Sequence, residues 1–175
     1  MTKNRELEQI IAGCQRGESE SFSRLVDIYS GRFYGYFYRL TGNRTISDDL
    51  LSELFVKLVE KIGSFKGGSF DGWVFRIASN IFHDFLRAKQ RGKKLLEGRK
   101  ELELENAQSG KADDERGEKL QVHLGKLDGD TRELIMLRYY SQLSFKEIAK
   151  LRAKPIGTVL AKVHRGLKKL RKSME

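Results

Sequence analysis

Basic side chains gather in two separate stretches of the chain. Residues 144–172 hold ten Lys and Arg and one acid, Glu147, for a net charge of +9. Residues 86–100 carry +6, and the acidic stretch 101–118 between them carries −5. Two clusters of cations of this density are typical of a protein that contacts a polyanion such as a nucleic acid. The alternative is that each cluster is simply a solvated helix face.

Residue patterns for catalysis are weak by comparison. The three histidines are far apart in sequence and have no metal-ligand spacing, and Gly67-Gly68 is not followed by the Lys-Ser or Lys-Thr of a phosphate-binding loop. The single cysteine, Cys14, excludes an internal disulfide and is expected to be a small buried apolar residue. We therefore expect no enzyme activity, no catalytic residue, no metal and no cofactor.

The composition sets the class of protein. The chain has 175 residues, a pI of about 9.7, a mean hydropathy of −0.53, 33% charged residues and one proline. One proline favours long helices over a turn-rich β fold. The first residues contain no apolar core of a secretion signal, and no stretch approaches 18 apolar residues. These observations predict a reduced, intracellular protein without a membrane span.

A hydrophobic period of about 3.6 residues runs through most of the chain, which predicts an all-α fold. The helices predicted for the N-terminal part are residues 4–16, 19–41, 45–62 and 71–96, the third opened by a capping box of Thr45 and Asp48. Residues 97–118 lose the period and are predicted to be a flexible charged linker, about 25 Å in mean span. Four short helices are predicted in residues 119–175, two of them opened by capping boxes that begin at Asp130 and Ser144. The prediction is two small helical domains, 1–96 and 119–175.

The last segment has the form of a helix-turn-helix. A short helix over 145–151 is followed by a turn of about four residues and by a helix that starts at Pro155. Apolar residues of the second helix recur on one predicted buried face: Ile156, Val159, Val163, Leu167 and Leu170. Such a helix can enter a DNA major groove with its basic tail along phosphates. The alternatives are an amphipathic bundle helix, or a basic helix on a membrane surface or in a partner's groove.

Two helices of the N-terminal part also have surfaces beyond a core stripe. The predicted helix 45–62 has a core stripe of Leu51, Leu54, Phe55, Leu58 and Ile62, and further apolar residues, Leu50, Val56 and Val59, beside an acidic edge. Such a surface suits a docking partner, although a central helix surrounded by its own neighbours would have the same pattern. The predicted helix 71–96 has a core stripe of Val74, Ile77, Ala78, Ile81 and Phe85, and its other side combines Trp73 with polar and basic residues. A glycine-containing loop with two aromatics, 64–70, precedes that helix, and aromatics with cations are suited to holding unstacked bases.

Together these stretches resemble one family, the extracytoplasmic-function (ECF) sigma factors of bacterial RNA polymerase. The sigma-2 domain of the family is similar to SDDLLSELFVKLVEKIGSF…SFDGWVFRIASNIFHDFLRAKQR, and its sigma-4 domain is similar to LDGDTRELIMLRYYSQLSFKEIAKLRAKPIGTVLAKVHRGLKKLR. The resemblance covers about residues 20–95 and 119–172. It implies a factor that binds core RNA polymerase and directs transcription initiation at specific promoters, in the cytoplasm and at the nucleoid when active. An anti-sigma factor is a further expected partner.

The resemblance also implies a role for each surface. Docking on the β′ clamp helices of the polymerase is expected from Asp48, Asp49, Glu53, Phe55 and Lys57. Recognition and melting of the −10 element is expected from Ser64, Phe65, Lys66, Phe70, Trp73, Arg76, Asn80, Arg87 and Arg91. Reading of the −35 element is expected from Thr158, Leu160, Ala161, Lys162, His164, Arg165 and Lys168, with sigma-4 also contacting the β flap.

The chain departs from the family pattern at several of these positions. Ser52 stands where the family usually has Gln, and Ala153 stands where it has a turn Gly. Leu160 and Ala161 replace a basic residue and a serine, and neither can donate a hydrogen bond to guanine, although both can pack on thymine methyl groups. We therefore expect Lys162, His164 and Arg165 to carry more of the binding. A stand-alone regulator that reads an operator with its helix-turn-helix remains the alternative function.

Overall fold

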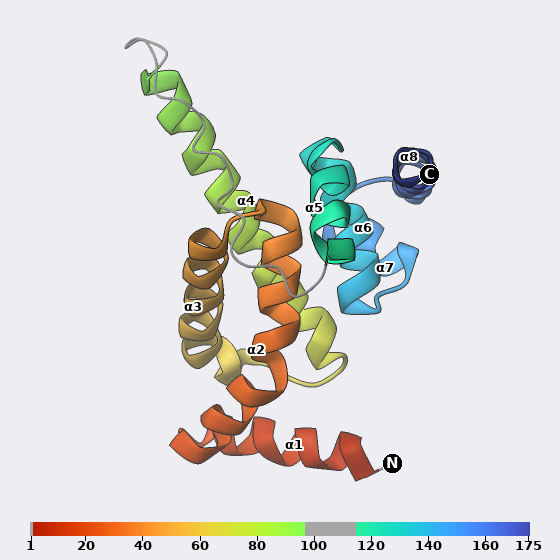
Figure 1. The fold of residues 1–175 in the computed structure, drawn as a ribbon. Helices are drawn as coiled ribbons and strands as arrows, with labels where there is room; N and C mark the ends of the chain where they lie inside the picture. The colour runs from red at the N-terminus through yellow and green to blue at the C-terminus, as the bar shows by residue number, and fades with distance from the viewer. Residues whose placement is uncertain (1, 97–114) are drawn as a thin grey trace.

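The computed structural model describes residues 2–96 and 115–175, and each regular element in these ranges is a helix (Figure 1). In chain order the elements are α1 (Thr2–Gln15), α2 (Ser19–Thr41), α3 (Arg44–Lys61), the 3₁₀ turn η1 (Ile62–Ser64), α4 (Phe70–Leu96), α5 (Glu115–Gly125), α6 (Gly129–Ser141), α7 (Phe145–Leu151) and α8 (Ile156–Met174). The all-α prediction is confirmed. The predicted linker lies largely outside the described residues, and its last four positions are wrong, because 115–118 form the first turn of α5.

Two of the three predicted capping boxes are wrong. The side chain of Asn43 caps α3 by accepting from the backbone N–H of Ile46 at 2.9 Å, so Thr45 and Asp48 lie inside the helix. Asp128 caps α6 in the same way, by accepting from Thr131 at 2.9 Å. Only Ser144 forms the full box, with Glu147, at the start of α7. In each case the cap satisfies a backbone donor that has no partner within the helix.

The core of the N-terminal half forms around α2, which packs against α1, α3 and α6. The aromatic run of α2 is buried at Phe33, Tyr36 and Phe37. On α3 the buried face is rotated from the prediction, because Leu50 is buried whereas Leu51 and Phe55 are half-buried. The predicted core stripe of α4 is buried except for Phe85, which is half-buried. Figure 1 shows α1 crossing the end of α2, and α4 projecting beyond the helical body.

In the C-terminal half, α6 is the central helix and contacts α7 and α8. α7, the four residues that follow it, and α8 form the predicted helix-turn-helix. Gly166 lets α8 approach α6, because a Cβ there would lie 2.6 Å from Thr131. The predicted buried face of α8 is correct for Val159, Val163 and Leu170 and wrong for Ile156 and Leu167, which are 47% and 50% exposed.

The turn before α8 contains an unfavourable backbone conformation. Ala153 has φ +48°, a left-handed value that is costly for any residue with a Cβ and is usually taken by glycine. This is the position at which the sequence departs from the turn glycine of the family that it resembles. The turn therefore keeps its geometry at a small cost in stability.

The two halves pack directly on each other. α6 contacts α2 and α4 as well as α8, and α5 contacts α2. Helix α6 is thus the layer between the N-terminal helices and α8. Because packed helices lie about 8–10 Å apart, α4 and α8 are separated by about 20 Å in this arrangement.

Candidate nucleic-acid interface

The polar stripe predicted on α4 is present in the structure. Arg76, Asn80, Arg87 and Arg91 are exposed, and Trp73, at the start of the stripe, is half-buried. The spacing of three and four residues places them along one side of the helix. Arg87 lies 3.6 Å from the carboxylate of Asp84, one turn earlier, and this exposed pair adds little stability. The surface offers one aromatic ring and a row of hydrogen-bond donors.

An aromatic cluster supports the loop before α4. The ring of Phe65 lies 5.2 Å from that of Phe70 and 5.4 Å from that of Trp73, centroid to centroid. Phe70 is only 5% exposed, so it supports the cluster from inside and has no free face for a base. Ser64 and Lys66 are exposed, and the Ser64 hydroxyl donates to the carbonyl of Lys61 at 2.6 Å. Phe65 and Trp73 are therefore the two rings of this cluster that reach the surface.

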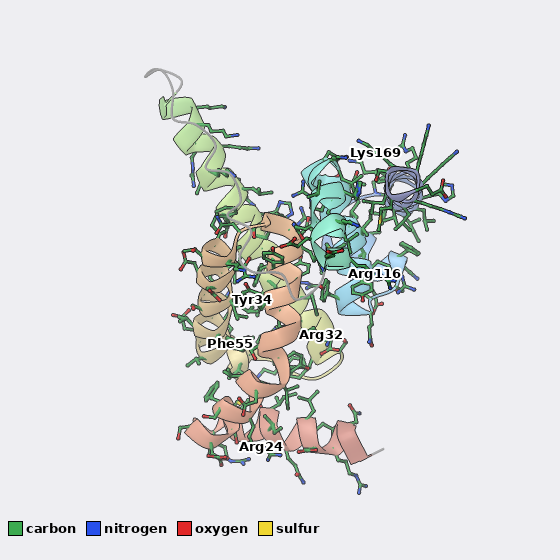
Figure 2. The ribbon with its side chains drawn as sticks, viewed as in Figure 1. Arg24, Arg32, Tyr34, Phe55, Arg116 and Lys169 are labelled. Carbon is green, nitrogen blue, oxygen red and sulfur yellow. The ribbon has the colours of Figure 1, made fainter. Side chains whose placement is uncertain are left out.

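The outer face of α3 combines acids with apolar side chains. Asp48, Asp49 and Glu53 are exposed, and Val56 and Val59 are each 57% exposed. The remaining predicted docking residues, Phe55 and Lys57, are half-buried, and the Lys57 ammonium lies 3.4 Å from Glu53. Figure 2 shows Phe55 on the side of the N-terminal half that is away from α5 to α8. The apolar surface with a charged edge that the sequence predicts is thus present on α3.

Most of the predicted −35 residues are exposed on α8. Thr158, Leu160, Ala161, His164, Arg165 and Lys168 are exposed. Lys162 is the exception, because its ammonium is hydrogen-bonded to Asp130, which also pairs with Lys154 at 3.1 Å. Burial opposes ionisation of Asp130, but the hydrogen bonds from Lys162 and Lys154 outweigh it and hold the pKa of this carboxyl below its usual value. One of the three residues expected to carry more of the binding is therefore partly neutralised within the domain.

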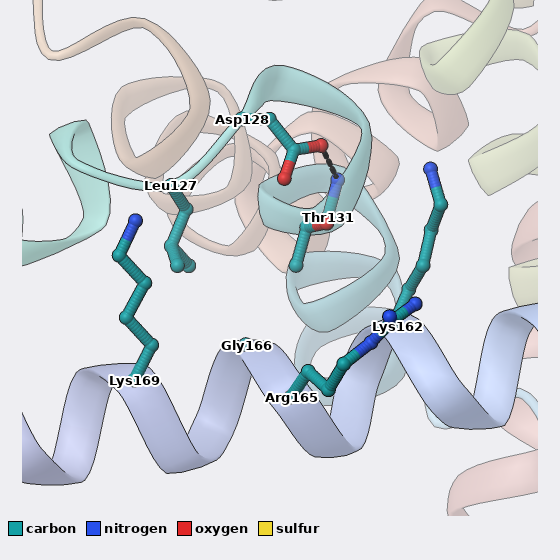
Figure 3. Close-up of a pocket in the computed structure, with 7 residues that line it drawn as sticks. All are labelled: Leu127, Asp128, Thr131, Lys162, Arg165, Gly166 and Lys169. Atoms are coloured by element: carbon teal, nitrogen blue, oxygen red, sulfur yellow. Dashed lines mark hydrogen bonds between the residues drawn. The ribbon is translucent and has the colours of Figure 1, made fainter.

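A small cavity of about 240 Å³ lies between α8 and the start of α6 (Figure 3). Lys162, Arg165 and Lys169 line it from α8, and Asp128 lines it from the cap of α6. Lys169 also donates to the carbonyl of Lys126 at 3.0 Å. The cavity is part of the basic surface of the helix-turn-helix, so we treat it as belonging to the candidate DNA-binding surface.

A buried carboxylate joins the two halves. Glu133 on α6 is fully buried and accepts from the hydroxyl of Ser79 on α4 at 2.6 Å. Its second oxygen lies 2.5 Å from the ring nitrogen of His83 and 3.3 Å from the guanidinium of Arg152. A buried carboxyl group costs free energy unless such hydrogen-bond partners meet it. The cluster therefore ties α4 to α6 and to the residue that follows α7.

Arginine side chains make further bonds between the halves. Arg32 on α2 donates to the carbonyl of Tyr140 at 2.7 Å and also pairs with Asp71 at 3.0 Å, and Figure 2 shows it on the side of α2 that faces the C-terminal half. Arg132 on α6 donates to the carbonyl of Leu40 at 2.8 Å. The side chain of Tyr140 approaches the backbone of α2 closely at Gly35, where a Cβ would lie 3.0 Å from the Tyr140 hydroxyl.

Sequence reasoning missed this interface. The signals that could have indicated it are Ser79 and His83, polar residues on a helix that is apolar on more than one side, and Glu133, which we assigned to a cap. None of them identifies its partner in sequence, because the partners are 50 or more residues away.

Three other features of the described residues bear on function. Across residues 2–96 and 115–175 the structure contains no group of three or more His, Cys, Asp or Glu side chains arranged to hold a metal ion. Over the same ranges, no helix has the length and apolar character needed to cross a membrane. Cys14 is buried as expected, and burial raises the pKa of its thiol.

Two family profiles match the chain in order. Residues 25–92 match Sigma-70 region 2, and residues 118–170 match Sigma-70 region 4. The chain is 30% identical to the ECF RNA polymerase sigma factor SigW of Bacillus subtilis, over 96% of each protein. It is 32% identical to the ECF RNA polymerase sigma factor SigE of Mycolicibacterium smegmatis, where the match covers 86% of this chain and 60% of the relative's length.

The fold is also similar to that of a solved structure. The sigma factor RpoE of Bartonella quintana, determined in complex with the anti-sigma factor NepR, superposes with a TM-score of 0.70 and 23% sequence identity. That match covers 89% of this chain and 97% of RpoE. At this level of identity the likeness concerns the fold.

Proposed function

Because this chain belongs to the ECF sigma factor family of bacterial RNA polymerase, we propose that its two halves divide promoter recognition between α4 and α8, with α3 holding the polymerase. The observation that carries the proposal is that both matched regions place exposed donors on one side of a basic helix. The protein is a transcription initiation factor. We infer that it has no catalytic residue of its own and that the polymerase supplies the chemistry.

Docking on core polymerase is assigned to α3. The exposed acids Asp48, Asp49 and Glu53 meet the basic side of a partner, and Val56 and Val59 bury apolar surface beside them. Phe55 and Lys57, which are half-buried, set the position of this face. The partner is expected to be the coiled-coil clamp helices of the β′ subunit, as in the family.

Opening of the −10 element is assigned to the loop 64–70 and to α4. Trp73 and Phe65 supply the ring surface for an unstacked base, and Arg76 and Asn80 supply donors beside it. Farther along α4, Arg87 and Arg91 lie where they can contact phosphates of the strand. Phe70 acts indirectly, by supporting the other two rings.

Reading of the −35 element is assigned to α8. Thr158, Leu160 and Ala161 lie in the first turns of the helix, where helix-turn-helix proteins contact base edges. Leu160 and Ala161 suit thymine methyl groups rather than guanine. The basic residues His164, Arg165 and Lys168 follow toward the phosphates, and Lys162 can join them only by leaving Asp130.

Promoter binding requires the packed halves to separate. Two elements one to two turns of duplex apart are about 34–68 Å apart along the DNA, whereas α4 and α8 lie about 20 Å apart with α6 between them. The connecting residues between Leu96 and Glu115 are long enough to allow this when extended. We therefore place the working domains at 1–96 and at residues from 115 onward.

Two further expectations follow from the family. An anti-sigma factor is a fitting regulator, since the structural relative RpoE is bound by one. The site of action is the cytoplasm, at the nucleoid when the factor is active, because the polymerase and the promoter are there. Co-purification from the native cell tests the first expectation, and an unbound factor would count against it.

Reversal of charge at Glu53 tests the proposal. Glu53→Lys places a cation on the acidic edge of α3, and we expect core polymerase to bind more weakly and promoter-specific transcripts to fall in proportion. Glu20→Lys makes the same change at an exposed position of α2 and serves as the control. Failure of the purified wild-type protein to bind core polymerase would overturn the proposal and favour a stand-alone regulator.

A further inference from the structure

Gln15 connects the first helix to the loop before α4. It is the last residue of α1 and lies outside the matched region 25–92. Its side-chain amide donates to the carbonyl of Ile62 at 3.0 Å and to the carbonyl of Phe65 at 2.9 Å. An amide nitrogen has two N–H donors, so both are used on this one segment.

The two carbonyls lie where the backbone leaves regular structure. Ile62 opens the turn η1, and its carbonyl also accepts from the backbone N–H of Phe65 at 3.1 Å. Carbonyls at a helix end lack partners within the helix. Beyond them Gly67 and Gly68 take φ values of +105° and +87°, which residues with a Cβ rarely adopt. Gln15 therefore holds the start of a loop whose path depends on its glycines.

Phe65 is held from both sides as a result. Its carbonyl bonds to Gln15 on α1, and its ring packs 5.4 Å from that of Trp73 on α4. The position of the Phe65 ring beside Trp73 thus depends on where its backbone is fixed. A shift of this backbone would change the ring surface that the loop offers.

Helix α1, which carries Gln15, is packed into the core of the N-terminal half. Ile10, Ile11 and Cys14 of α1 are buried there. At Gly13, a Cβ would lie 2.0 Å from the Ser21 hydroxyl, so α1 approaches the start of α2 closely. Gln15 therefore reaches the loop from a helix that is anchored by the burial of these residues.

We propose that Gln15 is a positioning residue for promoter opening: it sets the backbone of the loop so that Phe65 and Trp73 can receive a base. Gln15 does not touch the DNA in this scheme. The inference rests on the proposed function, and it adds α1 to the parts of the chain that open the −10 element.

The test compares two variants of the same chemistry on the same helix. Gln15→Glu keeps the size of the side chain but replaces both donors with a carboxylate that faces two carbonyls. Gln9→Glu makes the same change at an exposed position of α1 and is the matched control. In holoenzyme, we expect Gln15→Glu to slow open-complex formation about 5–150-fold, the range for two lost hydrogen bonds. The affinity of Gln15→Glu for core polymerase should equal that of the wild type. Gln9→Glu should match the wild type in both core-polymerase affinity and the rate of open-complex formation.

A second readout needs neither polymerase nor DNA. Trp73 is the only tryptophan in the chain, so its fluorescence quenching by acrylamide reports on the ring cluster in the free protein. We expect quenching to rise in Gln15→Glu and not in Gln9→Glu. Gln15→Lys, which restores a donor, should recover part of both effects.

The outcomes separate this inference from the proposed function. If the wild-type protein binds no core polymerase, the proposed function fails, and the quenching comparison still decides whether Gln15 positions the loop. Wild-type opening rates and wild-type quenching in Gln15→Glu would overturn the inference. So would an equal loss of core binding and opening, since that would indicate a general effect on the fold.

Discussion

The two surfaces assigned to promoter DNA, on α4 and on α8, are built alike but differ in the helices that surround them. Each is one side of an amphipathic helix with a basic tail. α8 packs on α5, α6 and α7, all within its own half, and leaves its predicted DNA side open. α4 packs on its own half and also on α6, and a cleft of about 300 Å³ separates Trp73 and Arg76 from Leu143 and Lys150.

The difference concerns access. Thr158, Arg165 and Lys168 of α8 are exposed in the packed arrangement, whereas Trp73 of α4 lines a cleft with Leu143 and Lys150 of the C-terminal half. Both surfaces are therefore present in the free protein, but we expect only one to be ready for DNA. The predictions below test that contrast, from the largest expected effect to the smallest.

Trp73→Ala removes the ring from the α4 surface only. Stacking of a base on an aromatic ring contributes about 1–3 kcal/mol, so open-complex formation should fall about 5–150-fold. Binding of a duplex that carries only the −35 element should not change. Trp73→Phe, which keeps a ring, controls for the packing of Phe65 and Phe70. Unchanged opening in Trp73→Ala would show that α4 does not hold the base through this ring.

Gly35→Leu should make the α4 surface as accessible to DNA as the α8 surface. A Cβ at Gly35 would already lie 3.0 Å from the Tyr140 hydroxyl, so a larger side chain forces the halves apart, at an overpacking cost of about 1–3 kcal/mol. We expect a larger radius of gyration by small-angle scattering and several-fold tighter binding of a −10 single strand. Gly31→Leu, with no neighbour within 4 Å of its Cβ position, is the matched control. An unchanged radius would contradict the packed arrangement.

Arg165→Ala and Lys162→Ala should differ on the α8 surface. Each cation that neutralises a phosphate adds about 0.9 to the slope of log K against log salt. Arg165 is exposed, so its loss should lower the slope by about that amount, whereas Lys162 is held by Asp130 and its loss should lower it less. Titration of a −35 duplex at several salt concentrations measures both slopes. Equal slopes for the two variants would show that Lys162 leaves Asp130 on binding.

Ala153→Gly should change stability without changing the surfaces. The left-handed φ of +48° at Ala153 costs less in a glycine, so we expect the free energy of unfolding to rise by about 0.5–1 kcal/mol. Thermal unfolding should shift upward by about 1–4 °C. Binding of a −35 duplex should stay the same, because Ala153 lies before α8. A lower unfolding temperature would mean that the turn does not store this strain.

Much of the fold followed from local pattern. The hydrophobic period gave the extents of α2 and α4 within one residue, and the Ser144 box marked the start of α7. Local pattern was misleading where the same residues were compatible with two different helix caps. Asp130 and Glu133 have the spacing of a cap, yet Asp128 does the capping and Glu133 is buried between the halves.

The candidate site residues could also be predicted only in part, because local pattern gives their exposure but not their long-range contacts. Exposure of Arg76, Asn80, Arg165 and Lys168 could be predicted, because the period of a helix places them opposite its core stripe. The pairing of Lys162 with Asp130 and the hydrogen bonds from Gln15 to Ile62 and Phe65 could not. These contacts join positions 32 to 50 residues apart, and no local pattern records the partner.

The sequence by itself determined the all-α class, the helix-turn-helix, the two basic clusters and the family, because propensity, periodicity and charge act over a few neighbouring residues. The tertiary structure decided which carboxylate is buried, which lysine is already paired, how α1 reaches the loop, and that α4 lies against the C-terminal half. Those outcomes depend on long-range packing, in which a buried carboxyl group such as that of Glu133 is tolerated only where Ser79, His83 and Arg152 meet it.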